Sequence, residues 1–303
     1  MGATQPAAGP RAAAGLFGLV IVLWGVNWPV MKQGLMYFPP LHFALLRMLL
    51  GAATMFSVAA LAGQLRVPAR QDWPIVLSVG VMQMSAFMAL SFFGLQYVGS
   101  GRAAILAYTT PLWVLPLSML VLGERPDGAK WSGFVLGLAG VVVLFNPLGF
   151  DWSQPRVLLG NGLLLCGAAL WAVQIVHVRH HRWIGSPLSL VPWQQAVAVA
   201  VLAPLTWLFE PDAGVSWTPA SIAILAYNGP LATGFCFWAM LTVTRALPAL
   251  TTSIGSLATP MVGMLAGALW LGEPLSWTNA GGLALIGVAV MTLALRDAWS
   301  RRA

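Results

Sequence analysis

Ten long stretches of the sequence carry almost no charge, and they restrict the possible folds more than any other feature. They cover residues 16–35, 41–62, 74–95, 103–122, 131–148, 157–177, 188–208, 220–244, 251–271 and 277–295. About 20 apolar residues span the hydrocarbon core of a bilayer as a helix. Since 59% of the residues are hydrophobic and only 8% are charged, an ordinary water-soluble domain is excluded. We therefore expect an all-α integral membrane protein with ten transmembrane helices.

The distribution of basic residues predicts the orientation of these helices. If the N-terminus lies in the cytoplasm, eleven of the 15 Lys and Arg residues fall in cytoplasmic segments, whereas Lys32, Arg102 and Arg156 fall on the other side. This asymmetry follows the positive-inside rule, and an even number of spans places both termini in the cytoplasm. The bases are scattered over short connections, so the net charge of +7 does not indicate a nucleic-acid partner.

The two cysteines, Cys166 and Cys236, both fall in the middle of predicted spans. A cysteine in such a place behaves as a small hydrophobic residue. We therefore expect neither a disulfide framework nor a metal site, and no cofactor.

An internal repeat divides the chain into two halves. The segment that begins at Thr109 recurs at Ala258, and both copies carry TP followed by LGE at a constant offset of 149. Further upstream the offset is 147. Equivalent pairs include Trp24 with Trp171, Asn27 with Gln174, Pro40 with Pro187 and Arg47 with Gln194, and, at the offset of 149, Gly80 with Gly229.

Each half holds five spans, and this odd number has a geometric consequence. The second half must enter the membrane from the opposite side, so the repeat is inverted, as in secondary transporters whose substrate site lies near the midplane. The expected parts are a cytoplasmic tail (1–15), a first five-helix repeat (16–148), a linker (149–156), a second five-helix repeat (157–296) and a cytoplasmic C-terminal tail (297–303).

Two five-span halves that open with LWG or LWA and close through TP, GE and G resemble the EamA-type exporters of the drug/metabolite transporter superfamily. The resemblance covers essentially the whole chain, and within the superfamily it is strongest to bacterial amino-acid exporters of the YddG type. It implies a multi-pass transporter of the bacterial inner membrane that moves aromatic and other neutral amino acids outward by alternating access. It also implies that the protein is not an enzyme. The expected partners are a small-molecule substrate and the bilayer. The chain is then a monomer or a homodimer.

Polar and aromatic residues deep in the spans are the candidates for a substrate cavity, because lipid offers them no hydrogen-bond partner. Trp24, Asn27 and Trp28 lie at i, i+3 and i+4 and therefore share one helix face. Trp171 and Gln174 repeat the arrangement in the second half. The other candidates are Gln83, Tyr108, Tyr227, Asn228, Trp238, Ser253 and Ser256. Taken singly, each of these fits an interhelical hydrogen bond or core packing equally well.

The positions of the charged residues narrow the substrate class. All eight Asp and Glu residues lie at or beyond span ends, whereas an antiporter for cations would bury a carboxylate. Glu124 and Glu273 each follow a glycine that can cap a helix. Only Arg47 lies well inside a span, either as a structural arginine near the external surface or as a functional one. A neutral or zwitterionic solute with an apolar body fits best.

Three alternatives stay open. The chain can export another class of metabolite or drug, and its transport can be coupled to protons through His42 or His177, or uncoupled. It can also be an intramembrane lipid-modifying enzyme, for which HVRHHR, residues 177–182, is the only histidine cluster. That cluster equally fits a solvated basic loop.

Overall fold

The computed structural model describes residues 9–145, 153–212, 214–272 and 277–299, and every regular element within these ranges is helical. The elements are α1 (Pro10–Gly34), α2 (Pro40–Leu61), η1 (Arg70–Asp72), α3 (Trp73–Ser78), η2 (Val79–Ala86), α4 (Phe87–Tyr97), α5 (Ser100–Ala107), α6 (Thr110–Leu117), η3 (Ser118–Leu122), α7 (Gly128–Phe145), α8 (Pro155–His180), α9 (Pro187–Phe209), α10 (Pro219–Ala226), η5 (Tyr227–Phe235), α11 (Cys236–Ala246), α12 (Ala249–Gly255), α13 (Ala258–Leu271) and α14 (Trp277–Trp299). The all-α class is confirmed for this part of the chain.

Within the described ranges, seven helices are long and apolar enough to cross a membrane, some of them formed by consecutive elements. They are Arg11–Gly34, Pro40–Leu61, Arg70–Tyr97, Ser100–Leu122, Pro155–His180, Pro187–Phe209 and Pro219–Ala246. The shorter apolar helices Gly128–Val143 and Ala258–Trp270 coincide with two further predicted spans, and α14 covers the last. The number of ten crossings stays a prediction.

Proline and glycine set the limits of these helices. Proline occupies the first turn of several of them, where its missing N–H costs no hydrogen bond; examples are α1, α2, α8, α9 and α10. Gly123 and Gly272 end η3 and α13 with left-handed φ angles of 63° and 67°. Only glycine adopts this conformation freely, so the repeated LGE pattern encodes a helix stop, as the sequence predicted.

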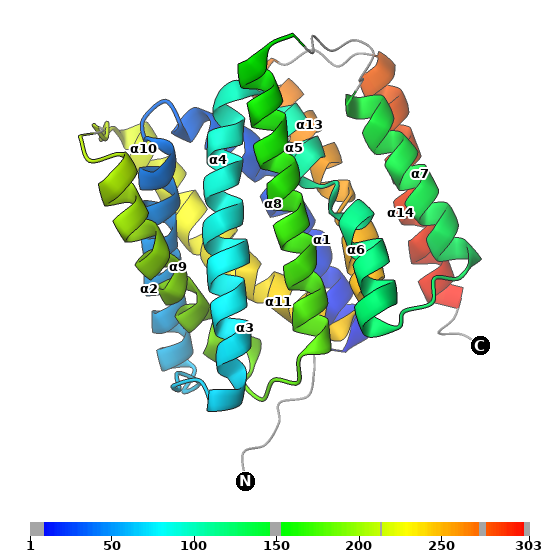
Figure 1. Cartoon of the computed structure of the whole chain (residues 1–303), viewed down its shortest axis with the longest axis horizontal. Coiled ribbons are helices and arrows are strands. Elements are labelled where there is room, and N and C mark those ends of the chain that lie inside the picture. The colour runs from blue at the N-terminus through cyan, green and yellow to red at the C-terminus, as the bar shows by residue number, and fades with distance from the viewer. Residues whose placement is uncertain (1–8, 146–152, 213, 273–276, 300–303) are drawn as a thin grey trace.

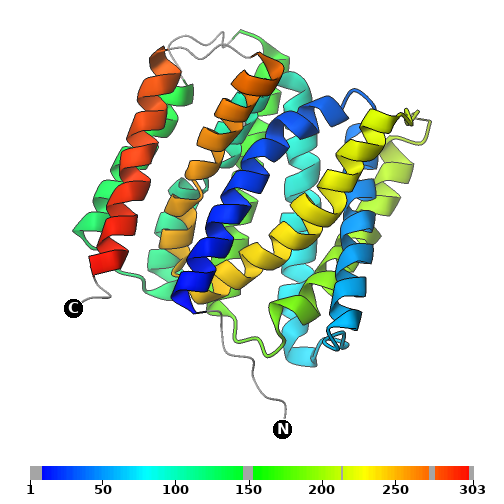
Figure 2. The same ribbon diagram turned by 180° about the vertical axis from the view of Figure 1, so that it is seen from behind.

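The helices form one bundle with a helix pair at each end. At one end α7 and α14 pack side by side, and at the other end α2 packs against α9 (Figures 1 and 2). A Cβ atom at Gly140 of α7 would lie 2.9 Å from the carbonyl oxygen of Gly282 on α14. The small residues of these two helices therefore serve close packing within the monomer.

Each half also packs on a π-helix of the other half. Helix α9 lies against η2 and helix α2 lies against η5. A glycine stands at each crossing, because a Cβ atom at Gly80 would lie 2.7 Å from the carbonyl oxygen of Gln194, and one at Gly229 would overlap Leu50. These two glycines are equivalent in the repeat. The two halves are therefore interlocked rather than placed side by side.

We predict that Gly80→Ala and Gly229→Ala each destabilise the protein by about 1–3 kcal/mol, the usual effect of an overfilled contact. The melting temperature of the detergent-solubilised protein measures this. Gly162→Ala is the matched control, since no atom lies within 4 Å of a Cβ at that position of α8. Equal melting temperatures for all three variants would contradict the close crossings.

Candidate functional site

Two π-helices stand at equivalent places in the repeat. Helix η2 covers Val79–Ala86 and η5 covers Tyr227–Phe235, and the offset of 149 maps one onto the other. Single π-helical turns inside α-helices are frequent at functional sites. Three predicted site residues lie on them, Gln83, Tyr227 and Asn228, and the two amides are buried. The structure therefore places both amides inside the bundle, away from lipid.

Two further spans are broken at equivalent positions. A turn at Tyr108 and Thr109 separates α5 from α6, and a turn at Ser256 and Leu257 separates α12 from α13. Both breaks precede the TP pattern, whereas helix α1 runs through Pro29 without a break. Discontinuous helices are typical of substrate sites in transporters.

Four aromatic side chains meet in the centre of the bundle, and we call them the central aromatic cluster: Trp24, Phe87, Trp171 and Phe237. The ring of Trp171 lies 5.3 Å from Trp24 and 4.5 Å from Phe87, and Trp24 lies 5.6 Å from Phe237, each in an edge-on arrangement. Helices α1 and α4 come from the first half, and α8 and α11 from the second. The cluster is therefore formed jointly by the two halves.

The predicted face of α1 contacts two different neighbours. The indole N–H of Trp24 donates to the carbonyl oxygen of Ala232 on η5 at 2.8 Å. Trp28 interacts with Tyr108 at the break between α5 and α6, and Tyr108 also interacts with Thr259. Asn27 between them is buried, and its side-chain oxygen has no hydrogen-bond partner among the described residues.

The remaining polar candidates of the second half lie in the interior. The Tyr227 hydroxyl donates to the carbonyl oxygen of Leu23 at 2.6 Å, and the Asn228 amide donates to that of Ile224 at 3.1 Å. The Asn228 oxygen accepts no hydrogen bond within the described part of the chain. Gln174 on α8 is buried.

The last three candidates, Trp238, Ser253 and Ser256, lie on α11, on α12 and in the turn after α12. Ser256 is buried at the break between α12 and α13, and the side chain of Ser253 lies outside the described residues. The ring of Trp238 packs against Phe235 at 5.6 Å. Phe237, and not Trp238, contacts Trp24 and Trp171.

The structure adds an interior arginine that the sequence left between two interpretations. Arg47 is 0% exposed, so it does not extend to the external surface. Its Nε donates to the hydroxyl of Thr233 at 2.8 Å, and its Nη1 contacts the sulfur of Met31 at 3.2 Å. Gln195 of α9 donates to the carbonyl oxygen of Thr233 at 3.3 Å. The sequence does contain a signal for this interior polar region, namely two adjacent amides in an apolar span, Gln194 and Gln195. Neither of them is among the site residues predicted from the sequence.

Acidic residues of one half bind backbone N–H groups of the other half, at helix starts or just before them. Glu210 after α9 accepts from the backbone N–H groups of Leu41 and His42 at 3.0–3.1 Å, and its carboxylate lies 2.9 Å from His42 Nδ1. Asp72 before α3 accepts from Ile184 and Gly185 at 2.6 and 3.0 Å.

Glu124 extends the same pattern, because its carboxylate accepts from Ala249 N at the start of α12 at 3.1 Å. Its repeat partner Glu273 lies outside the described residues. Glu210 and Glu124 satisfy helix N-termini, and Asp72 binds the connection before α9, which leaves all three a structural role at the span ends.

The histidine cluster also connects helices. His177 Nδ1 lies 2.8 Å from the Ser78 hydroxyl, and His181 Nε2 lies 2.8 Å from the carbonyl oxygen of Gln71. In the ranges that the structure describes, no group of three or more His, Cys, Asp or Glu residues is placed to hold a metal ion.

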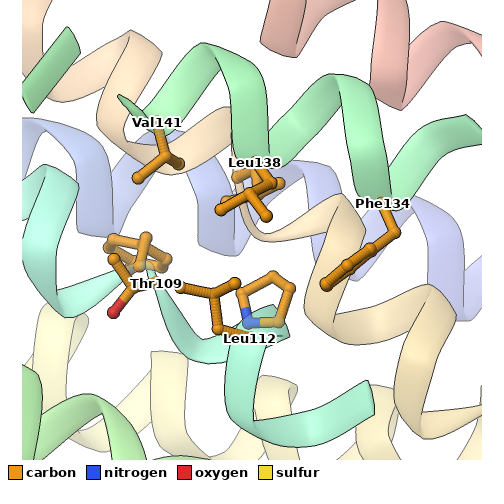
Figure 3. Close-up of a pocket in the computed structure, with 8 residues that line it drawn as sticks. Thr109, Leu112, Phe134, Leu138 and Val141 are labelled. Carbon is orange, nitrogen blue, oxygen red and sulfur yellow. The ribbon is translucent and has the colours of Figure 1, made fainter. Parts of the chain in front are cut away.

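A small pocket lies beside the break between α5 and α6 (Figure 3). It has room for about one water molecule, too little for a small-molecule substrate. Its lining is Tyr108, Thr109, Pro111, Leu112, Phe134, Leu138, Val141 and Leu257. The Thr109 hydroxyl already donates to the carbonyl oxygen of Leu106. The pocket is therefore an apolar gap between the core and α7, separate from the central aromatic cluster.

Comparison with known proteins gives consistent matches over nearly the whole chain. A sequence model of the EamA-like transporter family matches residues 12–146 and again residues 158–295. The uncharacterized transporter YoaV of Bacillus subtilis is 26% identical over 88% of this chain and 91% of its own length. A protein of Escherichia coli named a probable amino-acid metabolite efflux pump is 27% identical over 92% of this chain and 94% of its own. A solved crystal structure, 22% identical, covers 95% of this chain and 98% of its own at a TM-score of 0.77, and so shares the fold.

We predict that Asp72→Asn and Glu210→Gln each lower stability by about 1–2 kcal/mol. Glu210→Gln weakens a charged helix cap, and Asp72→Asn weakens the charge-assisted hydrogen bonds to the connection before α9. The losses should add in the double variant, since the two carboxylates lie at opposite ends of α9. Thermal unfolding in detergent measures them. Asp212→Asn, at an exposed position, is the control. A neutral result for both variants would show that the carboxylates do not hold the halves together.

Proposed function

The chain belongs to the EamA-like transporter family, and on this premise we propose that it exports neutral amino acids, aromatic ones among them, or similar small amphipathic metabolites. The relatives in Escherichia coli and Salmonella typhimurium that are named probable amino-acid metabolite efflux pumps support this substrate class. The bacterial sources of these relatives support placement in the inner membrane.

The proposed topology has ten spans in two inverted repeats, residues 16–148 and 157–296, with both tails in the cytoplasm. Two features support it. Helix α1 begins and α14 ends on the same side of the bundle (Figures 1 and 2), as an even number of crossings requires. The glycine stops, the breaks and the π-helices also recur at the repeat offset.

The central aromatic cluster is the observation that carries the mechanism. Its members come from both halves and pack together in the buried core, and Trp24 lies one helical turn from the buried amide of Asn27. When the halves rock against each other, the cluster opens to one side of the membrane at a time. The rings then receive an apolar side chain, and the interior amides bind the polar end of the substrate.

Uncoupled transport down the substrate gradient is the simplest driving force. No carboxylate is buried in the middle of a span in the described part of the chain, and the titratable pair of His42 and Glu210 lies at a helix end. Coupling to protons would have to act through such a pair or through His177.

An intramembrane enzyme is the second candidate class. Such an enzyme needs a base, nucleophile or metal set in one place, whereas the contacts of His177 and His181 tie helices and connections together. We expect the alanine variants of His177, His180 and His181 to keep transport within a few-fold of the wild type. Abolished flux in folded variants would favour a chemical role.

We predict saturable flux of labelled tryptophan, phenylalanine, methionine or threonine in proteoliposomes, and its loss by about tenfold or more in Trp24→Ala and Asn27→Ala, because these remove binding contacts. Trp207→Ala is the matched control, since that tryptophan is 77% exposed on the outer surface. An imposed pH gradient should leave the rate unchanged if transport is uncoupled. Absence of flux for all four amino acids with folded protein would remove this substrate class.

Labelling in intact cells tests the topology. In a Cys166→Ser background, an impermeant maleimide should label Met36→Cys from outside, but label Val67→Cys only after permeabilisation. Both positions are strongly exposed, and they lie in the connections before and after α2. The reverse pattern would invert the proposed orientation.

A further inference from the structure

Arg47 is the largest fully buried side chain of the described part of the protein. It lies two turns into α2, and its guanidinium reaches Thr233 on η5 and Met31 on α1. The Phe92 ring lies 5.8 Å from the guanidinium carbon. The side chain therefore extends into the space between the two halves of the molecule.

No anion among the described residues pairs with the positive charge of Arg47. Its partners are a hydroxyl, a thioether sulfur and an aromatic ring, and Nη2 makes no hydrogen bond to any described residue. An arginine stays protonated in proteins, and a buried charge without a counter-ion costs several kcal/mol. Two other basic side chains near span ends have different partners from Arg47. Lys32 and Arg245 donate to backbone carbonyls. Arg47 caps no carbonyl, so helix capping does not explain it.

Side-chain amide oxygens without a hydrogen-bond donor among the described residues lie near the contacts of Arg47. Gln195 shares Thr233 with Arg47, and its side-chain oxygen is without a partner in the described ranges. The same is true of the oxygen of Asn27, one helical turn from Met31, and of Asn228, one π-helical turn from Thr233. A single uncompensated cation near several uncompensated amide oxygens is complementary to a carboxylate next to an ammonium group.

The apolar part of the same environment is the central aromatic cluster. The Trp24 indole donates to the carbonyl oxygen of Ala232, the residue before Thr233. Arg47 and the central aromatic cluster therefore contact neighbouring residues of η5: Arg47 binds Thr233, and Trp24 binds Ala232. This arrangement separates a charged end from an apolar end within one site.

We propose that Arg47 is the carboxylate subsite of this transporter, so that its substrates are monocarboxylates with an apolar or aromatic body, such as free α-amino acids. The inference rests on the proposed transport function. The carboxylate pairs with Nη2 and replaces the weak sulfur acceptor at Nη1, which makes the ion pair bidentate. Gln194 holds the equivalent place in the second half, so the chain has one such anion subsite and the substrate has one orientation in it.

Competition against labelled phenylalanine in proteoliposomes tests the subsite. In the wild type, 3-phenylpropionate should compete with the transported amino acid, whereas phenylalaninamide and 2-phenylethylamine should need about 100-fold higher concentrations, because they leave the arginine unpaired. Equal competition by phenylalaninamide and phenylalanine would overturn the proposal without any mutation.

Substitution then assigns the selectivity to this residue. Arg47→Gln should weaken phenylalanine binding about 100-fold and leave phenylalaninamide unaffected, and Arg47→Lys should keep the preference for carboxylates with reduced affinity. Lys32→Gln is the control, because it removes the positive charge next to Met31, the α1 residue that Arg47 contacts. This variant should keep the preference for carboxylates. If Arg47→Gln does not fold, the Arg47→Lys variant and the competition series with the wild type still test whether Arg47 binds the carboxylate. An unchanged carboxylate preference in either Arg47 variant would give the arginine a structural role only.

A binding assay distinguishes failure of this proposal from failure of the transport function. Thermal stabilisation of the detergent-solubilised wild type by 3-phenylpropionate, lost in Arg47→Gln, would support the subsite even if no amino acid is transported. Transport of phenylalanine with no discrimination between acid and amide would keep the transport function and reject the subsite.

Discussion

Lipid offers no hydrogen bonds, and every polar group of this protein that enters the membrane must find its partner inside the chain. The structure follows this constraint closely. Glu124 and Glu210 bind helix N-termini, and Asp72 binds backbone N–H groups of the connection before α9. His177 binds Ser78, and the indole of Trp24 binds a backbone carbonyl. The exceptions are concentrated where the two halves meet. An unpaired guanidinium and unpaired amides in such a place need a partner from outside the chain, and the proposed carboxylate substrate supplies one.

The repeat of the two halves explains how the same constraint is met between them. The carboxylate after α9 caps α2, and the carboxylate after α2 binds the connection that precedes α9. These contacts lie at the span ends, on opposite sides of the bundle. In the middle, the halves meet through glycine contacts, aromatic rings and a few hydrogen bonds, such as the one from Trp24 to Ala232. In the proposed mechanism, rocking about the middle exchanges the end contacts on one side for those on the other.

The candidate site was only partly predictable. Tryptophan and amide at a helical spacing predicted that Trp24, Asn27, Trp171 and Gln174 face the interior, because that pattern is local, and all four are buried. The sequence could not predict that Phe237 joins the central aromatic cluster and that Trp238 packs against Phe235. The preceding residues form the π-helix η5, whose wider turn shifts the side chains that follow it. Arg47 shows a second limit. Its position in a span was visible, but whether it reaches water or the interior depends on helices far away in sequence.

The sequence by itself determined the class, the helix limits and the repeat, because these depend on properties that are local or periodic: apolar length, proline at the first turn, glycine at the stop and a constant offset. Only the tertiary structure decided which side chains meet. It brought Arg47 to Thr233 and left the guanidinium without an anion, and it placed Phe87 and Phe237 against Trp171. The physical reason is that helix rotation and crossing in a bundle are set by close contacts between distant segments, such as Gly80 with α9 and Gly229 with α2.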